Sequence, residues 1–386
     1  GEATLTLGNG SDFTGAANIN EGTLTVSGEL ATNTINVAEE ATLTTTAADL
    51  LSATATVTAD GTLNLGGDQT LNNLLGADTG VVNIGASNLL LTGGVNFQGR
   101  INGAGGSVSA GPGDLILGGE NTFTGDLVVL SGSTTTLTGS VDGNVNVNAG
   151  GELVLGSAER IADGANLNVD GILNTNGEET VTGFTATGTI NGSGTVSALT
   201  TSLNGATVNA NLGTGALTSE GDTDLNGTSA ADTVTVAGGT LTLDGALTNN
   251  TATVNVDAGT LAANGTVAAS SVNVAEGAAL TTGEAERLNN GVALTADGTV
   301  SLGGNETIGD LSGIGSIANN GNALTINQTS DQGFSGNITG AGGLTKQGEA
   351  TLTLGNGSDF TGAANINEGT LTVSGELATN TINVAE

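Results

Sequence analysis

Short alternating segments recur at a nearly constant spacing along this sequence. Leu5, Leu24, Leu43, Leu63 and Val82 follow one another at an almost constant step of about 19 residues. Each lies in a short strand-like segment, such as TLTL or TLTV, in which aliphatic residues alternate with Thr or Asn. Alternation with a period of two residues is typical of a β-strand that buries one face. The constant step predicts a solenoid, in which each turn places one strand directly above its predecessor.

Two all-β architectures fit strands that are separated by turns rich in Gly, Asn and Asp. One is a parallel β-helix (β-solenoid) with roughly 19 residues per coil, each coil rising by one strand spacing of about 4.8 Å. The alternative is a series of tandem β-sandwich domains. Sandwich cores usually contain a buried aromatic residue, and tandem domains usually have Pro-rich boundaries, whereas this sequence has no Trp, Tyr or Cys and one proline, Pro112. We therefore predict the β-helix, with a narrow aliphatic core.

The alternation also predicts which side chains face the interior. Leu24, Leu43 and Leu63 should point inward and stack in adjacent coils, because residues two apart in a strand share one face. Their neighbours should face the opposite way, namely Thr23, Thr25, Thr62 and Asn64.

One stretch of the sequence occurs twice. Residues 1–39 recur without change as residues 348–386, an offset of 347 residues. The opening letters GEATLTLGNG contain neither a start methionine nor a signal peptide. We therefore expect residues 1–386 to be one continuous solenoid, a window cut from an array of 347-residue tandem repeats.

Weaker duplications lie inside this repeat unit. The shift that carries Val37 onto Val274 aligns VAEEATLTT with VAEGAALTT, and it also places Phe97 on Phe334. A second shift, which carries Ala59 onto Val169, aligns ADGTLNLGGDQT with VDGILNTNGEET. The shifts predict three related blocks, residues 34–143, 144–270 and 271–380.

The charge balance excludes a nucleic-acid partner. The sequence has 38 Asp and Glu residues against 4 Lys and Arg, no His, and a formal net charge of −34. Phosphate recognition needs a basic face, but Arg100, Arg160, Arg287 and Lys346 are far apart in the sequence. Anionic membrane surfaces are disfavoured for the same reason. No apolar run approaches the roughly 18 residues of a membrane helix, so no membrane insertion is expected in this segment.

The composition also speaks against an enzyme. His, Cys, Tyr, Met and Trp are absent, so most side chains used in nucleophilic and acid–base catalysis are missing. A polysaccharide-degrading β-helix enzyme is a remote alternative, because it would need clustered carboxylates beside a basic residue. Arg160 and Arg287 follow glutamates in the similar phrases SAERI and EAERL, which favours local ion pairs. We assign no catalytic or cofactor-binding residue.

Acidic turns are the remaining candidates for ligand binding. Glu39 with Glu40, and Glu178 with Glu179, could bind Ca²⁺ weakly through carboxylate and carbonyl oxygens. Solvated turns are the favoured interpretation, so no metal ligand is assigned. The string GTSAADTVTVAGG from Gly227 lacks the stacked GGxGxD of calcium-binding arrays, and we expect an ordinary coil there. No Lys-Ser or Lys-Thr follows the GAGG runs at Gly103 and Gly340, which are expected to be turns.

One string in the sequence resembles a known repeat. It is GAGGLTKQGEATLTLGNGSDFTGAANINEGTLTV, from Gly340 to Val373, with weaker versions from Gly103 to Gly125 and from Gly213 to Leu243. Its GxGGLTK start, TLTL strand, Phe-Thr-Gly turn and closing GTLxV resemble the autotransporter-associated β-strand repeat of passenger domains in large bacterial surface proteins. The resemblance implies a right-handed β-helix that is exported from a Gram-negative-type bacterium and is extracellular or displayed on the cell surface.

These features together predict a structural protein. We expect a rigid, acidic, extracellular β-solenoid that forms a stalk, fibre or matrix filament, as in a biofilm matrix. Its expected partners are identical repeat units or neighbouring filaments, with divalent cations between them. The alternative is an adhesin passenger domain that binds a receptor or glycan, although the sequence has no long unique insertion that would form a binding loop.

Overall fold

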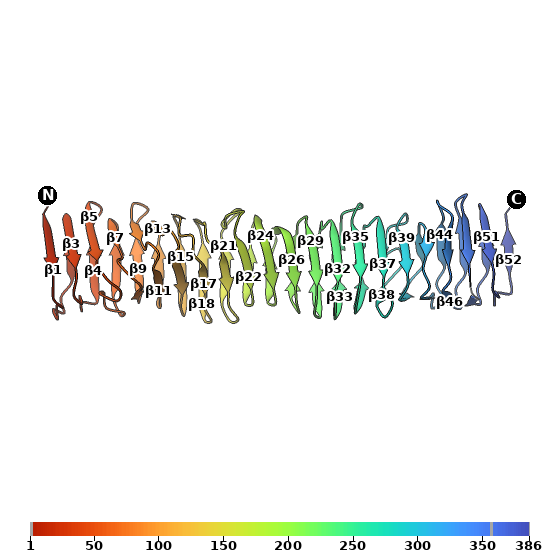
Figure 1. Cartoon of the computed structure of the whole chain (residues 1–386), viewed down its shortest axis with the longest axis horizontal. Coiled ribbons are helices and arrows are strands. Elements are labelled where there is room, and N and C mark those ends of the chain that lie inside the picture. The colour runs from red at the N-terminus through yellow and green to blue at the C-terminus, as the bar shows by residue number, and fades with distance from the viewer. Residues whose placement is uncertain (1–2, 356–357, 386) are drawn as a thin grey trace. The chain divides into compact units, whose positions relative to one another are not determined.

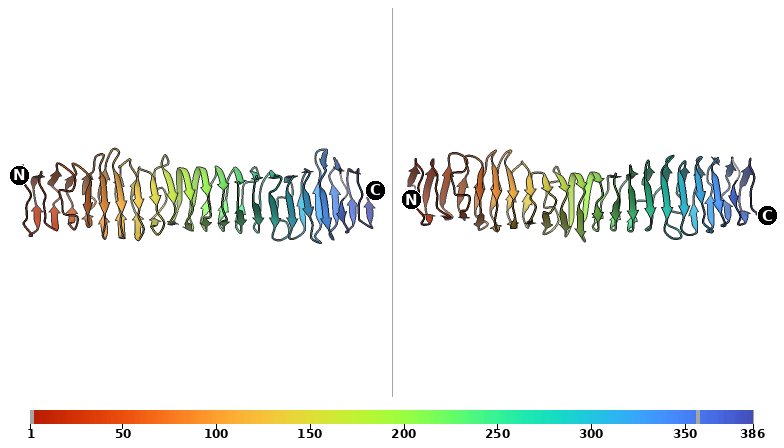
Figure 2. Two further views of the ribbon diagram at one scale, coloured as in Figure 1. Left: turned by 60° about the horizontal axis from the view of Figure 1, so that its bottom comes forward. Right: turned by 90° about the horizontal axis from the view of Figure 1, so that it is seen from below.

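The computed structural model describes residues 3–355 and 358–385. It divides into two compact units, Gly1–Ser197 and Ala198–Glu386. The described residues form β-strands and turns without any helix, so no helix in this part of the chain could span a membrane. Each unit is a parallel β-helix, in which strands from successive coils pair side by side (Figures 1 and 2).

Three parallel ladders form unit 1, and a full coil contributes one strand or short bridge to each. The first contains β1 (Thr4–Leu7), β3 (Gly22–Val26), β5 (Ala41–Thr45), β7 (Thr62–Asn64), β10 (Val81–Asn83) and β13 (Arg100–Asn102). The second contains β8 (Gln69–Leu71), β11 (Asn88–Leu91), β14 (Ser107–Ala110), β17 (Leu127–Val129), β20 (Val145–Val147), β22 (Asn166–Val169) and β24 (Glu178–Ala186). The third contains β2 (Ala17–Ile19), β4 (Thr34–Val37), β6 (Thr56–Ala59), β9 (Asn73–Gly76), β12 (Val95–Phe97), β15 (Gly113–Leu117), β18 (Ser133–Leu137), β21 (Glu152–Leu155), β23 (Ile172–Thr175) and β25 (Thr189–Gly192). A further pair is β16 (Glu120–Asn121) with β19 (Ser140–Val141).

Unit 2 is built in the same way. One ladder follows the end of β26 (Thr195–Leu203) and contains β29 (Ala216–Ser219), β32 (Thr233–Val236), β35 (Thr253–Val256), β37 (Ser271–Val274), β39 (Ala293–Ala296) and β42 (Leu311–Ser312). A second contains β27 (Thr207–Val208), β30 (Thr223–Leu225), β33 (Thr240–Leu243), β36 (Thr260–Ala263), β38 (Ala279–Thr282), β40 (Thr299–Leu302), β43 (Ser316–Ala318), β46 (Asn337–Gly340) and β49 (Asp359–Phe360). The shorter ladders are β28 (Asn211–Leu212), β31 (Thr228–Ser229) and β34 (Ala246–Leu247); β41 (Glu306–Ile308), β44 (Leu324–Asn327), β47 (Leu344–Gln347), β50 (Ala364–Ile366) and β52 (Ile382–Val384); and β45 (Gln332–Phe334), β48 (Thr351–Leu354) and β51 (Thr370–Val373).

The register confirms the predicted spacing. Paired residues of the first ladder in unit 1 form one column, which is Leu5, Leu24, Leu43, Leu63, Val82 and Ile101. Unit 2 has an equivalent column, which is Leu217, Val234, Val254, Val272, Leu294 and Leu311. Every described pairing joins successive coils in parallel, whereas a β-sandwich consists of antiparallel sheets. The β-helix prediction is therefore confirmed and the sandwich alternative is wrong.

The predicted core residues lie in the interior. Leu24, Leu43 and Leu63 are buried, and their Thr and Asn neighbours are only partly buried. The burial pattern of β5 alternates along the strand, as expected when one face packs inward and the other meets solvent. Stacked aliphatic side chains therefore fill the interior of unit 1 along this column.

The duplicated sequence shows that burial depends on the neighbouring coil. Leu5 and Leu352 occupy equivalent positions in the identical stretches, yet Leu5 is 59% exposed and Leu352 is 0% exposed. Leu352 is paired on both sides, with Gln332 and with Leu371, whereas Leu5 is paired on one side only, with Leu24. Since burying a Leu side chain contributes about 1.5–3 kcal/mol, each coil is stabilised at this position by the coils that cover it.

Phenylalanine and glycine form a recurrent turn. Phe97, Phe123, Phe334 and Phe360 are fully buried, and each is followed two residues later by Gly. At Gly125, for example, an added Cβ would lie 2.4 Å from the carbonyl oxygen of Gly106 in the preceding coil. Such a contact is far inside van der Waals distance, so only glycine lets the two coils approach. The Phe-Thr-Gly turn of the repeat is thus a packing requirement.

A charge at the centre of the first ladder should destabilise unit 1. Leu43→Asp would place an unpaired carboxylate between Leu24 and Leu63. We expect a loss of about 3–5 kcal/mol in the free energy of unfolding, measured by urea denaturation. Thr42→Asp on the outer face of the same strand is the matched control and should cost less than about 1 kcal/mol. Equal losses in the two variants would contradict the assignment of inner and outer faces.

Candidate functional site

Three turns of the same form interrupt the strands at residues 46–51, 156–161 and 283–288. Each contains a non-glycine residue in the left-handed region, Asp49 with φ 53°, Glu159 with φ 51° and Glu286 with φ 53°. In each turn the amide of that residue donates a hydrogen bond of 2.9 Å to a carbonyl oxygen of the next coil. Positive φ is uncommon outside glycine and is maintained only where the surrounding contacts fix the backbone. These turns are therefore held in place by the coil that follows them.

A buried polar side chain from the following coil binds each turn. In the first turn this is Gln69, whose Oε1 accepts from the amide of Leu51 at 3.1 Å and whose Nε2 donates to the Leu51 carbonyl at 2.9 Å. In the second turn it is Glu179, whose two carboxylate oxygens accept from the amides of Arg160 at 2.9 Å and Ile161 at 2.7 Å.

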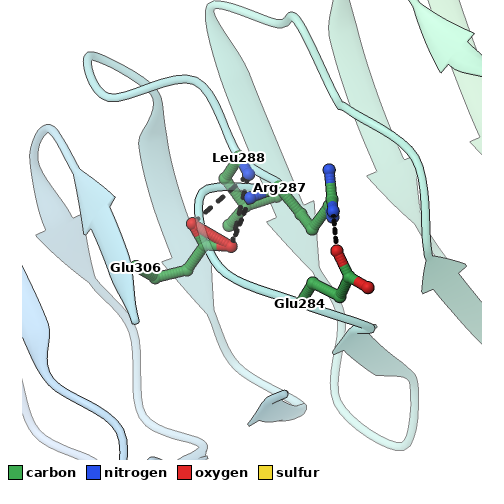
Figure 3. A network of polar contacts seen from close by, with 4 residues as sticks. All are labelled: Glu284, Arg287, Leu288 and Glu306. Atoms are coloured by element: carbon green, nitrogen blue, oxygen red, sulfur yellow. Dashed lines mark hydrogen bonds and ion pairs between the residues drawn. The ribbon is translucent and has the colours of Figure 1, made fainter. Parts of the chain in front are cut away.

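Glu306 takes the same position in the third turn (Figure 3). Its Oε1 accepts from the amide of Arg287 at 2.7 Å, and the amide of Leu288 lies 3.4 Å from both carboxylate oxygens. Glu179 and Glu306 are each 1% exposed, so their carboxyl groups are shielded from water. Backbone amides that would otherwise be unpaired are therefore satisfied by a side chain from the coil above.

Burial raises the pKa of both carboxyl groups. Desolvation is the largest cause, and it raises the pKa of Glu179 and of Glu306 to about 7, although the backbone amides favour the ionised form. The carboxylates of Glu159 and Glu286 raise these pKa values further, because like charges disfavour ionisation, while the charges of Arg160 and Arg287 lower them. Both groups thus titrate near neutrality, where an ordinary glutamate is fully ionised.

The two arginines of these turns point to different partners. Arg287 forms an ion pair with Glu284, three residues earlier, and its side chain extends away from Glu306 (Figure 3). Arg160 instead donates to Ser157 Oγ, which occupies the position equivalent to Glu284. The local ion pair expected from the sequence is thus confirmed for Arg287, with Glu284 in place of the adjacent glutamate. It is wrong for Arg160, because Ser157 replaces the acidic partner.

Lys346 is a buried cation that lies far from the other basic residues in the sequence. Its side chain is 0% exposed, and Nζ donates to the carbonyl oxygens of Gln347 at 2.8 Å, Gly348 at 2.7 Å and Glu368 at 3.3 Å. Burial lowers the pKa of Lys346, while the carboxylate of Glu368 raises it. The ammonium group therefore stabilises a turn by binding its carbonyl groups.

The two acidic pairs, Glu39 with Glu40 and Glu178 with Glu179, differ in their surroundings. Glu39 and Glu40 lie on an exposed turn, and Ca²⁺ binding there stays a prediction. Glu178 is exposed but Glu179 is buried, because adjacent strand residues face opposite ways, so the second pair does not share one surface. No group of three or more carboxylate, His or Cys side chains arranged to hold a metal ion occurs in residues 3–355 and 358–385.

The remaining motifs have ordinary surroundings. The GAGG run at Gly103 lies in the turn that follows β13, and the run at Gly340 begins at the last residue of β46 and forms the turn after it, as predicted. The string from Gly227 forms β31 and β32 of a regular coil in unit 2. Arg100 begins β13 with an exposed side chain.

Comparison with known proteins identifies the repeat at both ends of the chain. The model of the passenger-associated-transport-repeat family matches residues 1–26 and 344–373. The resemblance seen in the string from Gly340 to Val373 is therefore confirmed, and Lys346 lies inside the matched segment. No curated protein and no solved structure matches the chain. The matched repeat and the β-helix together fit a passenger domain of an autotransporter.

Removal of the Lys346 ammonium group should loosen its turn. Lys346→Met keeps the apolar stem but leaves carbonyl groups of Gly348 and Glu368 without this donor. We expect unit 2 to lose about 2 kcal/mol of unfolding free energy, measured by urea denaturation. Gln347→Met, on the outer face of the same strand, is the control and should change stability by less than about 0.5 kcal/mol. A loss no greater than that of the control would show that the buried ammonium group is dispensable.

Proposed function

We propose that this chain is a structural segment of a secreted or surface protein of a Gram-negative bacterium, and that it serves as a stalk, fibre or matrix filament. The match to a passenger-associated transport repeat supports the location. The β-helix supports the mechanical role, because its backbone hydrogen bonds join one coil to the next.

The in-register stacking of strands within each unit is the observation that most supports this proposal. Paired positions recur coil after coil in the columns that contain Leu43 and Val254. Each coil covers the open strand edges of its neighbour, so edges that could otherwise aggregate are paired along the stack. A segment of this kind would resist bending and stretching through many parallel hydrogen bonds, without any chemically specialised residue.

The surface charge supports a role in assembly. The chain has a formal net charge of −34, and Arg287 and Lys346 are already engaged by Glu284 and by carbonyl groups. Neighbouring segments should therefore repel one another unless cations lie between them, since surface charges interact over a Debye length of about 10 Å. Identical repeat units bridged by divalent cations are the partners that we propose. The proposal assigns no catalytic step to the chain.

The mechanical role predicts a continuous rod. An array of the 347-residue unit should appear in electron micrographs as an unbranched fibre of even width, advancing about 90 Å per unit. Regular beads or hinges at that interval would contradict the stalk and filament role. Saturable binding of a glycan or receptor by isolated single chains would favour an adhesin instead.

Divalent cations should promote lateral association. Millimolar Ca²⁺ or Mg²⁺ is expected to raise light scattering from the purified chain, because carboxylates such as Glu39 and Glu40 can share a hard cation. NaCl at equal ionic strength separates bridging from screening, since it screens charge without bridging. Equal association in both salts would mean that screening alone acts, and constant scattering in all salts would mean that the charge serves solubility only.

A further inference from the structure

The three related turns at residues 46–51, 156–161 and 283–288 are bound by side chains that differ in their ability to titrate. Gln69 binds the first turn as a neutral amide, whereas Glu179 and Glu306 bind the other two as carboxyl groups. All three side chains are buried, and all three accept hydrogen bonds from the backbone of the preceding coil. The chain thus contains two titratable versions of one structural device and one version that cannot titrate.

We propose that Glu179 and Glu306 make their turns respond to pH, so that residues 156–161 and 283–288 are held more firmly in mildly acidic medium and open more readily above neutrality. The device is independent of the proposed filament role, because it depends only on contacts between neighbouring coils within each unit.

Neither carboxyl group forms an ion pair at its buried position, although Arg160 and Arg287 act on them from a distance and favour the ionised form. Around Glu306, the charged groups of the turn below are Glu284, Glu286 and Arg287, and Arg287 is directed to Glu284. Strand β44, which pairs with β41 from above, has no ionisable side chain. An ionised Glu306 is therefore opposed by desolvation and by the carboxylate of Glu286, and it is stabilised by backbone amides and by the charge of Arg287.

Glu179 has the same kind of surroundings. The charged groups that act on it are Glu159 and Arg160 of the coil below, and Glu178 precedes it in β24 on the opposite, exposed face. Arg160 is directed to Ser157, and Glu159 lies close enough to raise the pKa of Glu179. In the coil above, residues 195–197 at the start of β26 carry no ionisable side chain.

The sign of the effect follows from proton linkage. The pKa of each group is about 7 in the folded chain and 4.5 as an ordinary glutamate, so the folded state binds more protons between these values. Stability therefore rises as the pH falls from about 7 towards 4.5, and it is lost as the pH rises through 7. The chain has no His and no Cys, so no other ordinary side chain titrates in this window.

Backbone strain explains why the turns should be the part that opens. Glu159 and Glu286 are held at positive φ, with their amides bonded to Glu178 and Asn305 of the next coil. A weaker hold by Glu179 or Glu306 lets that backbone relax towards an ordinary conformation. The neighbouring ladders keep their own hydrogen bonds, so the opening stays local.

Hydrogen exchange measured against pH at constant NaCl concentration tests the proposal. In the full chain, the opening equilibrium at the amides of Arg160, Ile161, Arg287 and Leu288, corrected for intrinsic exchange, should rise on the order of tenfold between pH about 6 and about 8. The amide of Leu51, bound by Gln69, should show no such change. The double variant E179Q/E306Q should lose the pH dependence, and Q69E should confer it on Leu51.

Two results would overturn the proposal. One is pH-dependent opening that persists in E179Q/E306Q or that affects Leu51 equally in the unaltered chain. The other comes from the unaltered chain alone, and so holds even if a variant fails to fold. Carbon NMR of the glutamate side-chain carboxyl groups should show two titrations with midpoints near 7, and a spectrum in which every glutamate titrates near 4.5 would exclude the device.

Discussion

Backbone pairing between successive coils is the constraint on which the rest of this structure depends. A parallel ladder fixes each residue directly above a partner from the preceding coil, so an inward position is repeated in every coil of the stack. The contrast between Leu5 and Leu352 shows the energetic consequence, since identical sequences are exposed or buried according to whether a second coil covers them. Stability therefore resides between coils more than within them.

The same constraint dictates how polar groups enter the core. An inward side chain cannot turn to solvent, so a buried polar residue must find its hydrogen-bond partners within the protein. Gln69, Glu179 and Glu306 do so by binding the amides of a strained turn, and Lys346 does so by binding carbonyl groups. At the corners of the coils, backbone amides thus donate to a buried acceptor side chain, and backbone carbonyl groups accept from a buried donor side chain.

The fold could be predicted from the sequence, but the buried polar residues could not. The constant step from strand to strand predicts which strands pair, and the alternation around Leu43 predicts which side chains point inward, because both patterns follow from strand geometry. The alternation assumes an apolar interior, however, so it does not by itself identify Lys346 and Glu306 as inward. Their signal was present, since each occupies an inward position of the alternation in LTKQ and ETI. The ion pair predicted for Arg160 was wrong because of one residue, since Ser157 stands where the related turn has Glu284.

Nearest-neighbour architecture also explains how the turns can differ without a change of fold. A coil contacts chiefly the coils on either side, so replacing a glutamine by a glutamate alters one local equilibrium and leaves distant coils unaffected. Gln69 and Glu306 have nearly the same shape and accept the same kind of amide hydrogen bond, yet only the second changes its charge near neutral pH. The response of a long solenoid to its medium can therefore be set coil by coil, through the residue placed at this one inward position.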